Sequence, residues 1–283
     1  MANTGKSLFY KRLAAVAGVL FVTLAAASPP LGASVAYTGS LQFATGNYIF
    51  DQNTNGYYFF NGLSFSAGRF SFSGSLPVIF QSTPYVSYSS VGMLPSGGSE
   101  SSAVSGRQGR GQVVLPEPVD FEQFGLGDPL LHMDLEVFKG GKSIPSVRLT
   151  AGIKVPLADV EKGFGTGEWD YGGGLSLSKA LGKTFVFVDL SYWVMGDLPD
   201  LDLKDTLSYS VALGQSLAGG KFALLASFSG YTRIIAEVEP PSVVGLGLSY
   251  RIDSKKSFMV NSTFGLTEST PDFSVSLGWR IGL

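Results

Sequence analysis

The sequence predicts an all-β fold, a transmembrane antiparallel up-and-down β-barrel of about 12 strands. Three observations lead to this prediction. Of the 283 residues, 45% are hydrophobic and only 15% are charged, whereas a soluble domain carries about 25% charged residues. Beyond residue 40, no uncharged apolar run approaches the ~20 residues that a membrane helix needs. Apolar residues instead recur with a period of two, as in strands with one lipid-facing and one water-facing side.

The N-terminal segment, residues 1–36, is predicted to be a secretory signal peptide. Basic residues start the chain, an uncharged apolar run follows at 13–27, and small residues continue to Ala36, near which we expect cleavage. A membrane anchor is the alternative, but the run is short and Pro29 would break a longer helix. The mature barrel is then expected over 37–283.

Charge and cysteine content exclude several classes of protein. Loss of the three basic residues of the signal peptide changes the formal charge from −2 to 17 − 22 = −5. Mild acidity argues against nucleic acid as a partner. The absence of Cys excludes disulfide scaffolds, thiolate metal sites and a lipid-modified N-terminal Cys.

The strands follow from the apolar alternation, which is clearest at the C-terminus, where Phe273, Val275 and Leu277 alternate with Ser274 and Ser276. A tilted strand needs about 9–11 residues to cross a bilayer. The expected strands are 41–50, 56–67, 69–80, 126–138, 144–156, 169–181, 184–196, 206–217, 222–231, 242–252, 257–266 and 272–283.

The connections alternate between short and long, as in outer-membrane barrels with periplasmic turns and external loops. The short ones are rich in Gly or Asp, which suit tight turns. The longest link, 81–125, is expected to be either a disordered external loop or a segment folded inward as a constriction. Its Arg107 and Arg110 are candidate contacts for anionic lipopolysaccharide or a passing anion.

Most strand-borne charge is expected on the lumen side, much of it on the fourth and fifth strands. The predicted lumen-facing residues are Asp128, His132, Asp134, Glu136, Arg148, Lys154, Asp189, Arg251 and Arg280. A tight turn in the hairpin of those two strands would place Asp134 opposite Arg148. It would likewise place Asp128 opposite Lys154, an arrangement that either fixes the strand register or sets the electric field along a pore.

Other inward positions are small, which leaves room in the lumen. They include Gly172, Gly174, Ser176, Ser178, Ser208, Ser210, Ala212, Gly214, Gly245 and Gly247. Phe187 and Trp193 are the candidate aromatic contacts inside the lumen. Trp169, Tyr171 and Tyr192 are expected in the aromatic girdle at the membrane surface.

Catalysis is not expected, and neither is a metal or cofactor. His132 is the only histidine, which excludes a multi-histidine metal site. A lipase would need a serine beside this histidine at the outer lipid boundary, but His132 falls in mid-strand with lumen parity. The run Gly163-Phe164-Gly165-Thr166-Gly167 lacks the lysine of a phosphate-binding loop.

Several short blocks resemble those of a known outer-membrane family. They are Gly125-Leu126-Gly127-Asp128, Leu149 to Pro156, and Gly165 to Tyr171 with Ser178-Lys179. In order and spacing from Phe124 onward, they are similar to the family named for the MetA pathway of phenol degradation, often labelled "transporter". The resemblance implies a β-barrel that moves hydrophobic or aromatic compounds, with Asp128 and Lys154 as inward charges. The sequence departs from outer-membrane barrels in ending on Leu283 rather than on an aromatic residue.

The sequence therefore predicts a passive channel in the bacterial outer membrane for small solutes, apolar or aromatic ones among them. The alternative is a structural or adhesive barrel with a closed lumen, and an outer-membrane lipase is a third reading. Expected partners are outer-membrane lipid and lipopolysaccharide, the barrel-assembly machinery during insertion, and a small solute of unknown identity.

Overall fold

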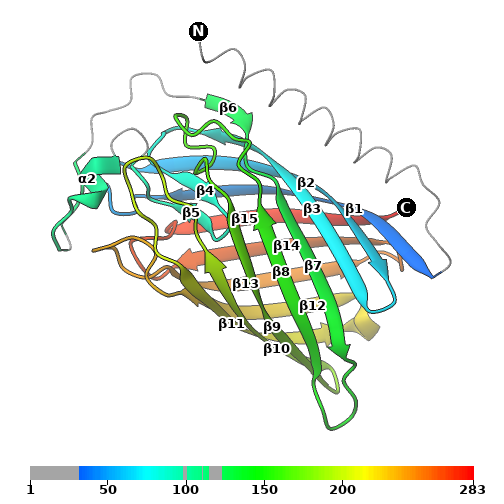
Figure 1. Cartoon of the computed structure of the whole chain (residues 1–283). Helices are drawn as coiled ribbons and strands as arrows, with labels where there is room; N and C mark the ends of the chain where they lie inside the picture. Colours follow the sequence, from blue (N-terminus) through cyan, green and yellow to red (C-terminus); the bar gives the residue numbers. More distant parts are fainter. Residues whose placement is uncertain (1–31, 98–100, 110, 115–122) are drawn as a thin grey trace.

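The computed structural model describes residues 32–97, 101–109, 111–114 and 123–283 (Figure 1). Most of the predicted signal peptide lies outside these residues. No helix within them is both long and apolar enough to cross a membrane.

Twelve long antiparallel strands form a closed barrel, which confirms the predicted fold (Figure 1). The strands are β1 (Ala33–Gly46), β2 (Thr54–Ala67), β3 (Phe70–Gln81), β7 (Leu130–Phe138), β8 (Ser146–Lys154), β9 (Asp170–Leu181), β10 (Thr184–Val194), β11 (Thr206–Leu217), β12 (Phe222–Tyr231), β13 (Ser242–Arg251), β14 (Lys256–Gly265) and β15 (Phe273–Gly282). Each strand pairs with the next one around the wall, and β1 pairs with β15 to close it. Closure leaves no long unpaired edge in a solvent that cannot hydrogen-bond to one.

The shorter elements lie at or beyond the strand ends. They are β4 (Ser87–Ser89), β5 (Gly92–Leu94), α2 (Ser101–Ser105), β6 (Gln123–Leu126) and the 3₁₀ turn η2 (Ala218–Gly220). β4 and β5 form a separate hairpin, and β6 pairs with the end of β3.

The two faces of the wall follow from the strand register, because directly opposed residues point to the same side of a sheet. Ile79, fully buried inside the barrel, lies opposite Tyr58. Residues of the other parity form the lipid face, where Leu213 and Leu246 are 55% and 62% exposed. The period of two in the sequence is thus the alternation between lumen and lipid.

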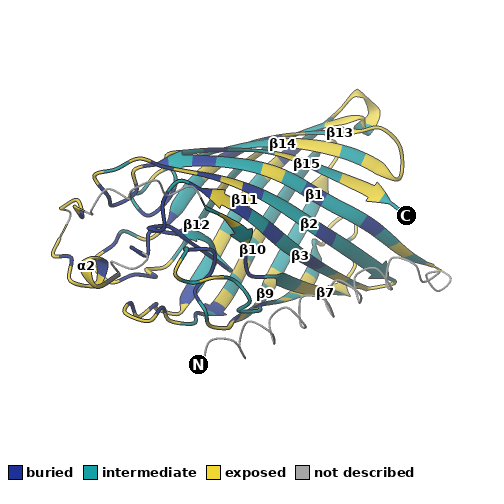
Figure 2. Ribbon diagram, turned by 90° about the horizontal axis from the view of Figure 1, so that it is seen from above, coloured by how far each residue is buried: buried dark blue, intermediate teal, exposed yellow. Residues whose placement is uncertain are grey.

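One end of the barrel has short turns and the other has long loops, so we take the short-turn end as periplasmic. Gly182 has a φ of 66° in its turn, a conformation that glycine adopts without strain. In the turn before β14, the N–H groups of Lys255 and Lys256 donate to the Asp253 carboxylate. The bond from Lys255 is the main reason why the pKa of Asp253 lies below its ordinary value. At the opposite end, buried residues concentrate in the loops (Figure 2).

The first strand differs from its prediction at both ends. β1 starts at Ala33 and ends at Gly46, whereas 41–50 was expected. Its early part is held by β2 and β15 on its two sides, with Ala36 opposite both Ser64 and Gly282. The four residues 33–36, expected in the signal peptide, therefore lie in the wall, and the cleavage position stays a prediction.

The hairpin of β7 and β8 has a different register from the predicted one. Arg148 lies opposite Glu136, not Asp134, and Lys154 lies opposite Leu130, not Asp128. The connection is longer than the tight turn assumed from the sequence, and a bulge follows Glu136. The predicted pairing of Asp134 with Arg148 is therefore wrong.

Candidate functional site

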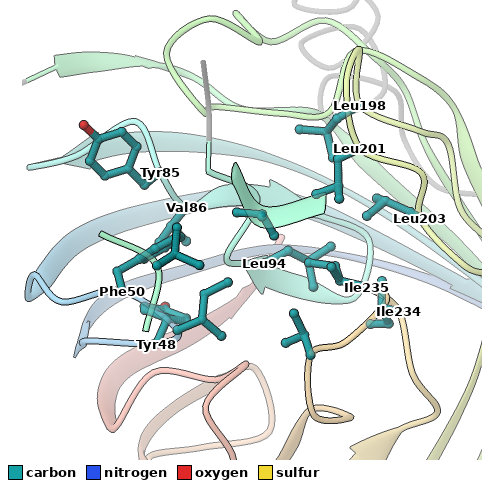
Figure 3. Close-up of a cluster of buried hydrophobic side chains, with 14 of the residues drawn as sticks. Tyr48, Phe50, Tyr85, Val86, Leu94, Leu198, Leu201, Leu203, Ile234 and Ile235 are labelled. Atoms are coloured by element: carbon teal, nitrogen blue, oxygen red, sulfur yellow. The ribbon is translucent and has the colours of Figure 1, made fainter. Parts of the chain in front are cut away.

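A hydrophobic cluster fills the long-loop end of the barrel (Figure 3). Its side chains come from the end of β10 and from the links that follow β1, β3, β10 and β12. They are Tyr48, Ile49, Phe50, Tyr85, Val86, Leu94, Val104, Val113, Trp193, Met195, Leu198, Leu201, Leu203, Ile234, Ile235 and Val238, each at most 9% exposed. We call this group the mouth cluster. Burial of so many apolar side chains drives these four links together over the lumen.

Part of the long link after β3 thus folds inward. Its hairpin of β4 and β5 places Tyr88 against Tyr58 and Phe60 on the lumen side of β2, with ring centroids 6.3 and 5.9 Å apart. Tyr58 and Phe60 stack on each other at 6.4 Å. Aromatic side chains therefore continue from the mouth down the inner wall.

A buried ion cluster lies where β8 ends and β9 begins, at the long-loop end of the barrel. Lys154 Nζ is 3.3 Å from Asp128 Oδ2 and 3.3 Å from Asp170 Oδ2, and all three side chains are fully buried. Lys154 also donates to the hydroxyl of Thr166. Although Asp128 and Lys154 are not opposite each other in the register, they do form an ion pair.

The same carboxylates hold the inward-folded links to the wall. Asp128 Oδ1 accepts the N–H groups of Leu157 and Ala158, each at 2.8 Å. Asp170 accepts the N–H of Ser90, at the tip of the β4–β5 hairpin, at 3.1 Å and that of Gly196 at 3.0 Å. Three links thus depend on one buried group of charges.

A second ion pair ties the outer part of the long link to the β14–β15 connection. Arg107 Nη1 and Nη2 donate to the two carboxylate oxygens of Glu268 at 2.7 and 2.9 Å. The Arg107 side chain is only 3% exposed. Arg107 is therefore engaged within the protein, and Arg110, the other candidate anion contact, lies outside the described residues.

The remaining predicted charges lie along the inner wall. Asp134 accepts the Ser71 hydroxyl at 3.2 Å, and Asp189 accepts that of Ser210 at 2.8 Å. Arg280 donates to the Ser64 hydroxyl at 2.8 Å. No ion pair with another described residue forms at Glu136, Arg148, Arg251 or Arg280.

Trp193, the member of the mouth cluster on β10, packs against the wall, where two glycines make room for it. A Cβ atom on Gly152 or on Gly172 would come within 2.5 Å of its indole. The imidazole of His132 meets the indole edge-on, with centroids 6.3 Å apart. Phe187 lies deeper on the same face of β10, opposite Ala212 and Ser178.

Gly152→Val will displace the Trp193 indole and lower barrel stability by about 1–3 kcal/mol, as overpacking does. The other two tryptophans are first replaced by Phe. The fluorescence emission of Trp193 then measures the displacement of the indole, and heat-induced unfolding measures the stability of the barrel. Gly214→Val is the matched control, because a Cβ there meets nothing closer than 3.5 Å. Equal emission and stability in the two variants would show that the indole does not depend on Gly152.

The predicted girdle aromatics lie on the lipid side near the external end. Trp169, Tyr171 and Tyr192 are 49%, 54% and 51% exposed. The Tyr192 hydroxyl donates to Asp205 at 3.1 Å. Their membrane role stays a prediction.

The sequence did not indicate Asp170, Glu268 or the mouth aromatics Tyr48, Phe50 and Tyr85. Parity offered a signal for Asp170, which shares the lumen face with Gly172 two residues later. Glu268 offered none, because its partner is 161 residues away.

A family model described as "Putative MetA-pathway of phenol degradation" matches residues 84–281. The chain belongs to this family. The match starts beside the inward-folded hairpin and runs to the last strand, so it includes the ion cluster and the mouth links that follow β3, β10 and β12. The resemblance drawn from the glycine-rich blocks is confirmed.

Among solved structures, the COG4313 outer membrane channel from Pseudomonas putida F1 has a TM-score of 0.62 at 12% identity, covering 90% of this chain and 97% of that chain. The P. putida toluene transporter TodX reaches only 0.43 at 11% identity, with 90% of each chain covered. No curated protein sequence matches this chain. The first similarity shows the fold, and this MetA-pathway family member is a barrel of the bacterial outer membrane.

Proposed function

We propose that the chain is a passive outer-membrane channel for small apolar or aromatic solutes. One observation carries the proposal: Met93 packs against both the mouth cluster and the aromatic group of Tyr88, Tyr58 and Phe60, so apolar side chains continue from the mouth to the lumen wall. An apolar solute can move along such a path from one apolar contact to the next without having to enter water. The family description, which refers to phenol degradation, points to the same kind of solute.

The lumen below offers little to retain a solute tightly. Opposed pairs such as Ser208 with Ser191 and Gly245 with Ser227 line it with small side chains. Conduction needs binding weak enough to allow release. A wall of this kind therefore suits passage better than storage.

We further propose that the protein is not an enzyme. Ser73 lies directly opposite His132, but both face the lumen rather than the lipid where a lipase would meet its substrate. The described residues contain no group of three or more side chains that could hold a metal ion. The channel proposal accordingly assigns no catalytic residue and no cofactor.

The cellular setting is also proposed. We infer a Gram-negative bacterium in which the apolar segment ahead of β1 directs export and the barrel-assembly machinery inserts the strands. Exposed aromatics such as Trp169 would then contact lipid and lipopolysaccharide.

The rival function is a structural or adhesive barrel without transport, and the filled mouth favours it. The two functions differ in whether solute enters cells.

The chain has no Cys, so a short bismaleimide added to the double variant Arg107→Cys/Glu268→Cys will cross-link only these two positions of the chain. The cross-link will hold the long link after β3 to the β14–β15 connection.

Uptake of the apolar fluorophore N-phenyl-1-naphthylamine by intact cells is the measurement. We expect faster uptake with the protein than with an empty vector, and cross-linking should abolish the difference. The single variant Arg107→Cys with the same reagent is the control. Uptake equal to that of the vector in every sample would leave only the structural barrel.

A further inference from the structure

We propose that a recess in the lower lumen binds aromatic carboxylates, such as benzoate, as they pass. The recess has a volume of about 370 Å³ and lies on the inner side of β1, β2, β3, β14 and β15, within the size range of small-molecule sites. This inference rests on the proposed channel function and narrows its solute class.

The recess has two rows of side chains, which the strand register defines. The upper row is Phe60, Ser40, Gly278 and Met259, and the lower row is Gly62, Thr38, Arg280 and Ser257. Rows two residues apart along a strand are separated by about 7 Å. The upper row thus offers an aromatic ring and a thioether, and the lower row offers a guanidinium and two hydroxyls.

Arg280 is the only charged residue that lines the recess. Its guanidinium is oriented by the Ser64 hydroxyl at 2.8 Å, and no ion pair joins it to any carboxylate of the described chain. A guanidinium has five N–H donors in a fixed fork that matches a carboxylate. A solute carboxylate would supply the acceptor that the protein does not.

The upper row selects the rest of the ligand. Phe60 stands at the lower end of the aromatic path from Tyr88, and Met259 is 43% exposed toward the lumen. A thioether and a phenyl ring both make favourable contacts with an aromatic solute. A ring held by Phe60 and Met259 would direct its carboxylate down toward Arg280.

The recess depends on a glycine that the wall does not itself need. A Cβ on Gly278 would meet nothing closer than 3.7 Å, so larger side chains fit the backbone. Such a side chain would project beside Ser40 and occupy the recess. Gly278→Leu therefore removes the space and keeps Arg280.

The test is fluorine NMR of 4-fluorobenzoate with the purified full-length protein in detergent micelles. We expect line broadening beyond that with empty micelles, and an apparent Kd that rises about tenfold or more in Arg280→Gln, because a charge-assisted bidentate contact is lost. Gly278→Leu should abolish the broadening. Trifluoroacetate, which has the charge without the ring, and 4-fluorobenzyl alcohol, which has the ring without the charge, should both bind weakly.

Two variants control for charge and for bulk. Arg148→Gln removes the same charge from β8, a lumen-facing position on a strand that lines no part of the recess. Gly214→Leu adds the same side chain elsewhere on the lumen wall. Neither should change the Kd by more than about twofold, since charges outside direct contact are screened.

Three results would overturn the proposed site. Broadening that survives Arg280→Gln would remove Arg280 from the site, and an equal loss in Arg148→Gln would mean that the lumen collects anions without a site. Equal binding of trifluoroacetate would eliminate the role of the ring. Normal fluorophore uptake by cells with Arg280→Gln would show that the channel function stands whether or not the site does.

Discussion

Lys154→Met will lower the free energy of unfolding by about 3–5 kcal/mol, the cost of removing one partner from a buried ion pair. Lys154 is the only cation in contact with the buried carboxylates of Asp128 and Asp170 among the described residues. The methionine side chain is about as long as that of lysine and tolerates burial. The loss of stability therefore measures the removal of the charge rather than a change in side-chain volume. The two carboxylates would be left adjacent in a medium of low dielectric constant.

The effect will extend to the mouth, because the same carboxylates hold the links. With Asp170 displaced by repulsion from Asp128, the N–H groups of Ser90 and Gly196 lose their acceptor. We therefore expect a higher and noisier conductance in planar bilayers as well as unfolding at a lower temperature. Heat-induced mobility shifts on gels and single-channel recordings measure the two effects separately.

Lys179→Met is the matched control. Lys179 donates to the carbonyls of Gly141, Lys142 and Ile144 at the exposed periplasmic end. Its loss should cost no more than about 1 kcal/mol, as exposed charge contacts usually do. Equal stability of the two variants would mean that the buried cluster contributes nothing beyond a surface contact.

The wall of the barrel could be predicted because the alternation within each strand indicates which residues face the lipid and which face the lumen. β11 and β12 lie where alternation placed them, at Thr206–Leu217 and Phe222–Tyr231. Lipid and lumen impose opposite demands on neighbouring residues, so a period of two leaves little freedom. Register is less local, because the connection between β7 and β8 is longer than a tight turn and shifts the pairing without any change in the alternation.

The mouth could not be predicted because an apolar residue looks the same whether lipid or protein buries it. Ile49 and Phe50 extended the expected first strand, but they leave the wall and enter the mouth cluster. Leu198, Leu201 and Leu203 lie in a link that also contains several aspartates, so its sequence resembles that of a polar external loop. Their packing partners come from other links, and no local pattern indicates such contacts.

Leu94→Asp will open the mouth. Leu94 ends β5 and is 2% exposed within the mouth cluster. A carboxylate at this position has no described cation to pair with, and burying it would cost several kcal/mol. The links can avoid that cost by separating into water, because strand pairing in the wall does not depend on Leu94. The free energy of unfolding of the barrel should therefore change little.

The expected result is a rise of at least about twofold in single-channel conductance, since an apolar constriction is what limits the current. Val114→Asp is the control, because it adds the same charge to the same link at a side chain that is 78% exposed. Fluorophore uptake by cells should rise with Leu94→Asp and stay unchanged with Val114→Asp. If conductance and uptake are the same in both variants, the barrier to passage lies below the mouth cluster, in the lumen. A charge in the mouth can relieve only a barrier that apolar packing creates there.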